Sequence, residues 1–194
     1  MRIKIALLTV FCFVSVMAVA NERAFQEQTT PFQLSICKPV QLAGELRSVK
    51  GLRLNVVYGK NVNVTGLDLG LINHTDENFS GLGFGAINYV DNTLNGLNIG
   101  LVNTVGSRAN GVMLGVFSNK TEGYTKGLQI ALMNRTEELV GVQAGLFNKA
   151  WSVCGLQIGL LNITEFLDGV QIGLLNVVKS KDQYPIMPVF NVAW

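Results

Sequence analysis

A short repeat fills most of this chain and limits its possible folds more than any other feature. Nine units follow one another, with opening octets such as GLDLGLIN, GLQIGLLN and GVQIGLLN, and their starts lie 14 to 16 residues apart. The units begin at Gly51, Gly66, Gly81, Gly96, Gly111, Gly127, Gly141, Gly155 and Gly169. One such unit cannot bury a core alone, so successive units must pack against each other. We number positions within each unit from its opening glycine, which is position 1.

The octet alternates in character with a period of two. Positions 2, 4 and 6 carry apolar residues, position 3 is usually polar, and position 5 is glycine in seven of the nine units. This alternation is typical of a β-strand with one buried face. We therefore expect Leu156, Ile158 and Leu160 to point into the core and Gln157 and Gly159 to point outward.

Another apolar residue precedes each new unit by two positions. We expect it to enter the core as well. This set comprises Val64, Phe79, Leu94, Ala109, Leu139, Val153 and Leu167.

Two architectures place one strand in each unit: a β-solenoid and an up-and-down β-barrel. The segments between octets are 6 to 8 residues long and do not alternate between short and long, as they would in an outer-membrane barrel. The octet also barely reaches the ~9–11 residues of a membrane-crossing strand. The terminal aromatic Trp194 speaks for the barrel. We predict an all-β fold, a single β-solenoid of about nine coils with N- and C-terminal caps, with a small antiparallel β-barrel as the alternative.

Asparagine recurs at position 8 and favours the solenoid. The set is Asn73, Asn88, Asn103, Asn134, Asn148, Asn162 and Asn176. In stacked coils these side chains would lie ~4.8 Å apart and hydrogen-bond in a ladder, whereas in a barrel they would alternate between two rims. The alternative is that asparagine merely ends each strand. Unit one, with Asn55 and Tyr58, and unit five, with Ser118, depart from the pattern, which argues against an uninterrupted ladder.

The first twenty residues have the features of a signal peptide. Arg2 and Lys4 precede an apolar run, residues 5–17, and Ala18-Val19-Ala20 fits a cleavage site. The run is shorter than the ~20 residues that span a bilayer. We predict a signal peptide at 1–20, an N-terminal cap at 21–50, the repeat array at 51–176 and a C-terminal cap strand at 177–194. The expected location is the periplasm, the outer membrane or the cell surface.

Composition argues against several classes of function. Without residues 1–20 the chain holds thirteen basic and thirteen acidic residues, which gives no basic surplus for nucleic acid. The acidic residues fall mainly between the octets, and His74 is the single histidine. We therefore expect no catalytic residues, no cofactor and no metal site, with His74 an ordinary surface residue.

Two outward columns are candidates for recognition. Gln129, Gln143, Gln157 and Gln171 occupy position 3 in four successive units and are expected to form a flat amide ledge that contacts glycan or another protein. Position 7 is apolar beside an inward position 6, so either the chain bends there or an apolar stripe is exposed. An exposed stripe of that length would mark contact with a partner or a membrane.

The cysteines distinguish the two folds. Cys37 lies in the N-terminal cap, and Cys154 lies just before the eighth unit. A disulfide needs Cα atoms within ~7 Å, whereas several coil spacings would separate these residues in a solenoid. Stacking therefore predicts two unpaired thiols, and a closed barrel would allow pairing.

The stretch VKGLRLNVVYGKNVNVTGLDLGLIN, the GLQIGLLN units and the closing FNVAW resemble a group of uncharacterised bacterial surface-repeat proteins, over about residues 31–194. The resemblance implies an exported, envelope-associated protein and supplies no activity, ligand or catalytic residue. We expect a non-enzymatic structural or interaction module whose partner is an envelope protein, a glycan or the outer membrane. A small outer-membrane barrel is the second hypothesis, and a carbohydrate-active solenoid enzyme is the third.

Overall fold

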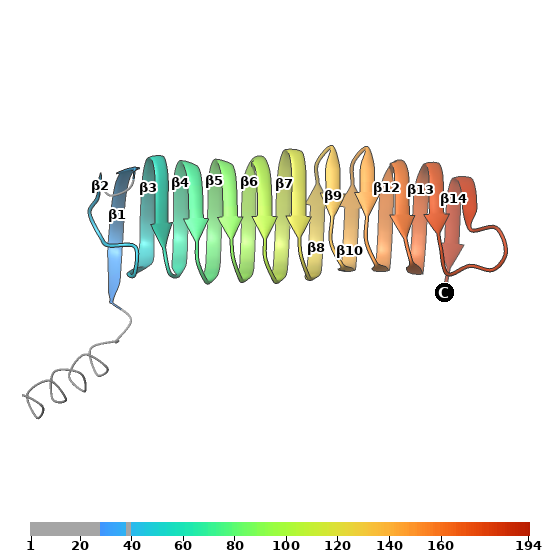
Figure 1. Cartoon of the computed structure of the whole chain (residues 1–194), viewed down its shortest axis with the longest axis horizontal. Helices are drawn as coiled ribbons and strands as arrows, with labels where there is room; N and C mark the ends of the chain where they lie inside the picture. The colour runs from blue at the N-terminus through green and yellow to red at the C-terminus, as the bar shows by residue number, and fades with distance from the viewer. Residues whose placement is uncertain (1–27, 38–39) are drawn as a thin grey trace, which may run out of the picture.

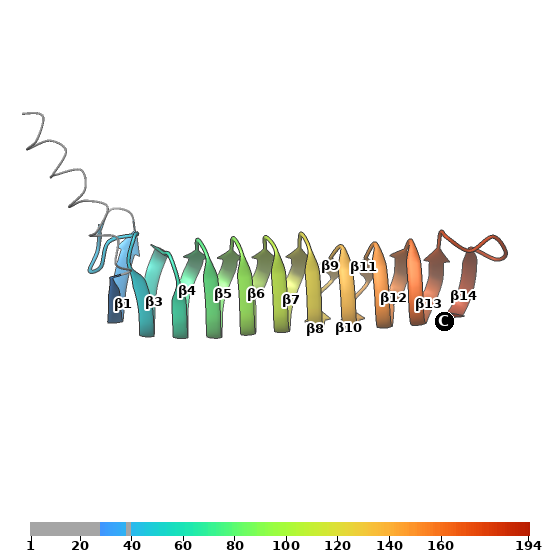
Figure 2. The same ribbon diagram turned by 90° about the horizontal axis from the view of Figure 1, so that it is seen from below.

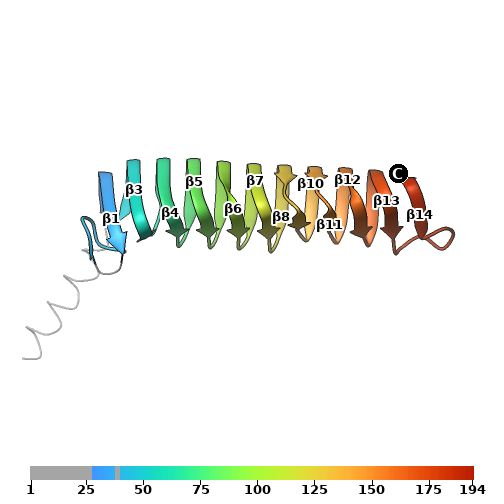
Figure 3. The same cartoon turned by 90° about the horizontal axis from the view of Figure 1, so that it is seen from above.

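The computed structural model describes residues 28–37 and 40–194, and the signal peptide predicted at 1–20 lies outside these residues. The described chain is a β-solenoid of about ten turns, not a barrel, so the barrel hypothesis is wrong. Figure 1 shows the turns side by side along one long axis, and the views from below and above show the same single row (Figures 2 and 3).

Most turns of the solenoid, or coils, contain one long strand that bends and returns. The strands are β1 Thr29–Cys37, β2 Val40–Gln41, β3 Ser48–Asn61, β4 Val64–Thr75, β5 Asn78–Val90, β6 Thr93–Val105, β7 Arg108–Thr121, β8 Tyr124–Ile130, β9 Met133–Arg135, β10 Glu138–Ala144, β11 Phe147–Lys149, β12 Ser152–Thr164, β13 Phe166–Val178 and β14 Ile186–Ala193. In the sixth and seventh coils the strand is divided, into β8 and β9 and into β10 and β11.

Successive coils pair in parallel and in register, so each repeat position forms a straight column. Gly141 lies beside Gly127 on one side and Gly155 on the other, and Asn148 likewise lies between Asn134 and Asn162. The main-chain N–H and C=O groups of each coil are thereby hydrogen-bonded to the same repeat positions of the coils beside it. The repeat of the sequence is therefore a repeat of the structure, as predicted.

The glycine at position 1 is required by the backbone. All nine of these residues have φ between +126° and +146°, a region that other residues rarely adopt. A Cβ on Gly81, for example, would overlap the carbonyl oxygen of Gly66 in the coil before it. Any larger side chain here would both strain the backbone and separate two coils.

The two ends are closed differently. β1 stacks in parallel on β3, and the two-residue β2 runs antiparallel beside β1. At the other end β14 returns antiparallel along β13. Figure 1 shows β14 as the last strand of the row, after a loop that leaves the solenoid.

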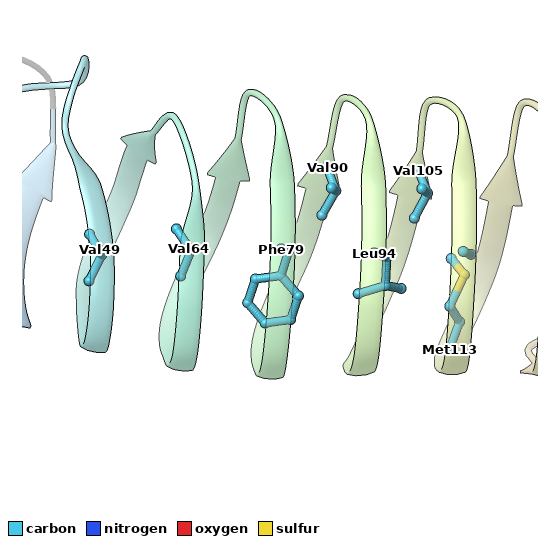
Figure 4. Close-up of a cluster of buried hydrophobic side chains, with 8 residues drawn as sticks. Val49, Val64, Phe79, Val90, Leu94, Val105 and Met113 are labelled. Atoms are coloured by element: carbon cyan, nitrogen blue, oxygen red, sulfur yellow. The ribbon is translucent and has the colours of Figure 1, made fainter. Parts of the chain in front are cut away.

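Two columns form one half of the interior. The column two residues before each unit is apolar except at Thr125, and the column at position 10 mixes valine and alanine with threonine. Val64 and Phe79 come from one side of the coil and Val90 and Val105 from the other, and they face each other across the interior (Figure 4). The prediction that the residue before each unit enters the core is confirmed, because Val153 is 1% exposed and the other members are buried as well.

Threonines interrupt this half of the interior in the middle of the array. Thr125 replaces the apolar residue before the sixth unit and hydrogen-bonds Thr136 at 3.0 Å. Gln129 donates to Thr121 and Thr125 at 3.1 and 3.2 Å. The apolar residues on the two sides of this layer accordingly form two separate clusters.

The predicted inside and outside of the octet are wrong. Gln157 is completely buried, whereas Ile158 and Leu160 are 42% and 52% exposed. The chain bends at positions 6 and 7, whose side chains both point outward. Because of this bend, odd positions are buried before it, such as position 3, and even positions are buried after it, such as position 8. The sequence correctly showed two different faces, but alternation alone does not say which face is buried.

Cys37 and Cys154, the two cysteines of the described residues, are free in this structure, as stacking predicted. Seven strands lie between β1, which contains Cys37, and β12, which contains Cys154, in the order of the sheet. Both side chains are exposed.

Candidate functional site

The glutamine column at position 3 lies in the core and is not a surface ledge. Gln129, Gln143, Gln157 and Gln171 are all completely buried. Each of the last three donates its Nε2 hydrogen to the Oε1 of the glutamine in the preceding coil, at 2.7 to 2.8 Å. The buried amides of Gln143 and Gln157 are tolerated because a glutamine is hydrogen-bonded to each of them on both sides, whereas Gln171 Oε1 ends the column without a partner. The predicted recognition ledge is therefore a structural element of the interior.

The asparagine ladder is present and continuous. From Asn73 to Asn176 each side chain donates to the next asparagine Oδ1 at 2.8 to 3.1 Å. The same Nδ2 group also donates to a main-chain carbonyl of the following coil, such as Asn148 to Ile158 O at 2.8 Å. The glycine at position 5 leaves room for this column, since a Cβ on Gly85 would lie 2.7 Å from Asn73 Nδ2.

The two departing units keep the ladder by local rearrangement. In the fifth coil one extra residue lets Asn119, rather than Ser118, take the ladder position. In the first coil the ladder residue is Asn55, at position 5, which donates to Asn73 Oδ1 at 2.8 Å. Gly59 occupies the place where the other coils have asparagine, and a Cβ there would overlap the Asn55 side chain. The expected interruption is therefore wrong.

A buried ion pair lies in the first two coils of the polar interior. Arg53 donates from Nε and from one terminal nitrogen to the two Asp68 carboxylate oxygens, at 2.8 and 2.6 Å. Its other terminal nitrogen donates to His74 O at 2.8 Å. Both side chains are at most 2% exposed, so each charge depends on the other for its solvation.

The outer surface is apolar where a soluble protein would be polar. Positions 2, 4 and 6 of all nine units carry only Leu, Ile, Val, Phe or Ala, and these columns face outward together with position 7. We call these four columns the apolar surface. Its most exposed members include Val56 at 60% and Leu174 at 68%. β1 extends it with Phe32, Leu34 and Ile36, which are exposed in the same columns.

The apolar surface is large for a monomer. Eleven neighbouring strands of the sheet contribute to it, namely β1, β3 to β8, β10 and β12 to β14. Strands ~4.8 Å apart and residues ~3.3 Å apart give a surface about 50 Å long and about 16 Å wide, or roughly 800 Å². The largest apolar patch on a typical monomer is roughly 300–600 Å² and often functional. This surface is the candidate functional site.

Charges are distributed unevenly around the apolar surface. Position 9, which borders position 7, carries Lys120, Arg135 and Lys149 in three successive coils that pair in register. Within the nine units, seven of the nine acidic residues lie in the turn beyond position 10. These are Asp76, Glu77, Asp91, Glu122, Glu137, Glu138 and Glu165.

One of the three basic residues is neutralised locally. Lys120 Nζ lies 2.6 Å from Glu122 Oε1, and this hydrogen bond lowers the pKa of Glu122 below its ordinary 4.5. Arg135 and Lys149 form no ion pair with the described residues. These two positive side chains therefore stand one above the other beside the apolar surface without a salt bridge to the described residues.

His74 belongs to a polar cluster near the first turns rather than standing alone. Its Nδ1 lies 2.8 Å from Tyr58 Oη, and its Nε2 lies 3.2 Å from Asp91 Oδ1 and 3.5 Å from Asp76 Oδ1. Lys60 Nζ also lies 3.0 Å from Asp76 Oδ1, and that hydrogen bond raises the pKa of Lys60. The side chains of His74, Asp76 and Asp91 are close enough to hold a cation, but Tyr58 and Lys60 already pair with two of them.

A groove lies over the polar turns of the sixth to ninth coils. Its lining mixes Arg135, Lys149 and Lys179 with Glu137 and Glu165. Trp151, which packs edge-on against Phe166 with ring centroids 5.8 Å apart, is also part of it. The mixture of both charges gives the groove no preference for one kind of ligand.

Comparison of the chain with protein-family models, with curated proteins and with solved structures found no match. In the described part of the chain, no helix is long and apolar enough to cross a membrane. The function must therefore be inferred from the geometry of the solenoid and its surface.

Sequence reasoning found the stripe at position 7 but missed the rest of the apolar surface, because it assigned positions 2, 4 and 6 to the core. The available signal was the glutamine column itself. Four identical amides at one position satisfy each other when stacked, by the same logic that placed the asparagines in a ladder. That logic predicts a buried position 3 and therefore outward positions 2 and 4.

Proposed function

We propose that this chain is an exported, non-enzymatic repeat protein of the bacterial cell envelope, which acts as a structural or interaction module. The observation that carries the proposal is the apolar surface of roughly 800 Å², a size that equals one partner's share of a standard protein interface. An exposed apolar surface larger than that of a typical monomer marks contact with a partner protein or a membrane. The signal-peptide features of residues 1–20 and the resemblance to surface-repeat proteins support a location in the cell envelope.

Carbohydrate-active chemistry has weaker support. Glycoside hydrolysis uses a pair of carboxylates, one of which must act as an acid or base. In the His74 cluster both carboxylates, Asp76 and Asp91, are in contact with His74, and Asp76 is also paired with Lys60. Because His74 and Lys60 already pair with Asp76 and Asp91, these carboxylates are not free to contact a substrate.

Cell fractionation tests the proposal. The full chain is produced in a bacterial host together with two variants, Leu146→Asp/Leu160→Asp on the apolar surface and Leu46→Asp outside it. All three leucines are exposed, so the same change of residue type is compared at two places. We expect the unaltered chain and Leu46→Asp to stay with the envelope without their first twenty residues, and the double variant to be released. An unprocessed protein in the cytoplasm, or retention of all three chains alike, would refute the proposal.

A further inference from the structure

We propose that the apolar surface docks on an anionic lipid bilayer, with the solenoid lying in the plane of the membrane. The inference rests on the proposed function, because it names the partner of the same surface. Three properties of the surface favour lipid over a second protein.

The first property is its side-chain chemistry. Protein interfaces of this size carry about one hydrogen bond per 100–200 Å² and are enriched in aromatic residues and arginine. The four columns of the apolar surface offer no N–H or O–H side-chain donor in the nine units, and they contain three aromatic residues, Phe84, Phe117 and Phe147. A mainly aliphatic surface without hydrogen-bonding side chains provides little orientation for a protein partner, whereas acyl chains require none.

The second property is the state of the backbone. Hydrocarbon accepts only chains whose N–H and C=O groups are already bonded. Each coil from β3 to β13 pairs with a neighbour on both sides, so the main chain beneath the apolar surface is already hydrogen-bonded. The coils can therefore meet lipid without new backbone bonds.

The third property is the charge distribution. Basic residues on the flank of an apolar surface are typical of proteins that lie in the interface of an anionic membrane. Arg135 and Lys149 are exposed, stacked in register and without an ion pair among the described residues. Most acidic residues of the repeat lie further along the chain, in the turn beyond position 10, where Glu137 and Glu165 line the groove that Arg135 and Lys149 also line. The basic side chains at position 9 therefore lie nearer to the apolar position 7 along the chain than the acidic turn does, and they are the charges proposed to meet lipid headgroups.

Sedimentation with vesicles tests the inference. The purified full chain is mixed with vesicles of phosphatidylcholine alone or of phosphatidylcholine with phosphatidylglycerol. We expect binding to the anionic vesicles that weakens with added salt. The variant Arg135→Gln/Lys149→Gln should partition about thirtyfold less strongly into anionic vesicles. Leu146→Asp/Leu160→Asp should lose binding to both, and Leu46→Asp should bind like the unaltered chain.

Circular dichroism and light scattering accompany each variant. A double variant that keeps its β spectrum and melting curve but loses vesicle binding supports the inference. Equal binding to both kinds of vesicle would overturn the role of the basic flank. A chain that ignores vesicles but forms dimers through the apolar surface would overturn lipid as the partner and leave the proposed function standing, since its own test is release from the envelope.

Discussion

Removing one amide from the glutamine column should destabilise this protein far more than removing an exposed leucine. In Gln157→Ala the column loses the bond to Gln143 Oε1 at 2.8 Å and the bond from Gln171 Nε2 at 2.7 Å. An acceptor and a donor are left buried without partners, and each costs ~1–3 kcal/mol. The expected loss in the free energy of unfolding is therefore about 2–6 kcal/mol. Leu160→Ala removes a side chain that is already 52% exposed, which costs about 1 kcal/mol or less.

The assay is unfolding in guanidinium chloride, followed by far-ultraviolet circular dichroism. Transition midpoints are compared, because repeat arrays need not unfold in one step. Gln157→Leu is the matched control: it keeps most of the volume and removes only the hydrogen bonds. We expect it to be almost as unstable as Gln157→Ala, which assigns the effect to the unpaired amides. If Leu160→Ala were as damaging as Gln157→Ala, the assignment of inside and outside would be refuted.

Two further predictions concern the first coils. In Gly59→Asn the new side chain collides with Asn55, so we expect a large fall in melting temperature. The double variant Asn55→Gly/Gly59→Asn should recover most of the loss, because the fifth coil already has glycine and asparagine four residues apart. A double variant as unstable as the single one would contradict this. Asp68→Asn leaves Arg53 charged and buried without its carboxylate, and we expect a loss of about 3–5 kcal/mol in the same denaturation assay; a loss below about 1 kcal/mol would show that the pair is not buried.

The sequence alone predicted the solenoid and much of its interior. Equal connecting segments and the asparagines at position 8 were sufficient to choose stacked coils, because only parallel stacking in register places equal repeat positions in one column. The buried residue before each unit, such as Val153, was also found. These features share one property: they depend on the period of the repeat and not on the direction of a side chain.

The inside and outside of the octet could not be read in the same way. The rule that aliphatic residues are buried assigned Leu160 to the core and Gln157 to the surface, and both assignments are reversed. The rule fails here because parallel stacking satisfies buried amides at almost no cost, so the core need not be apolar. The bend at positions 6 and 7 then changes the alternation. The glycine at position 5 directly precedes this bend in seven units, but the apolar pattern alone does not show that the chain turns there.

The swap in the first coil was outside the reach of sequence reasoning for another reason. Asn55 and Gly59 look like two independent departures from the repeat. Only the three-dimensional structure shows that the Asn55 side chain fills the place vacated at Gly59. A comparison of the units position by position does not show that a change at one position compensates for a change at another.

Exchange of side-chain amide hydrogens, measured by nuclear magnetic resonance on the unaltered protein, tests the central claim most directly. The claim is that amides are inside and aliphatic residues outside. We predict slow exchange for the NH₂ groups of Gln143 and Gln157, comparable to that of Asn148 in the ladder, and fast exchange for the exposed Asn92 and Asn95. Exchange of Gln143 and Gln157 as fast as that of Asn95 would contradict the claim, because the glutamine column would then face water and the leucines would form the core.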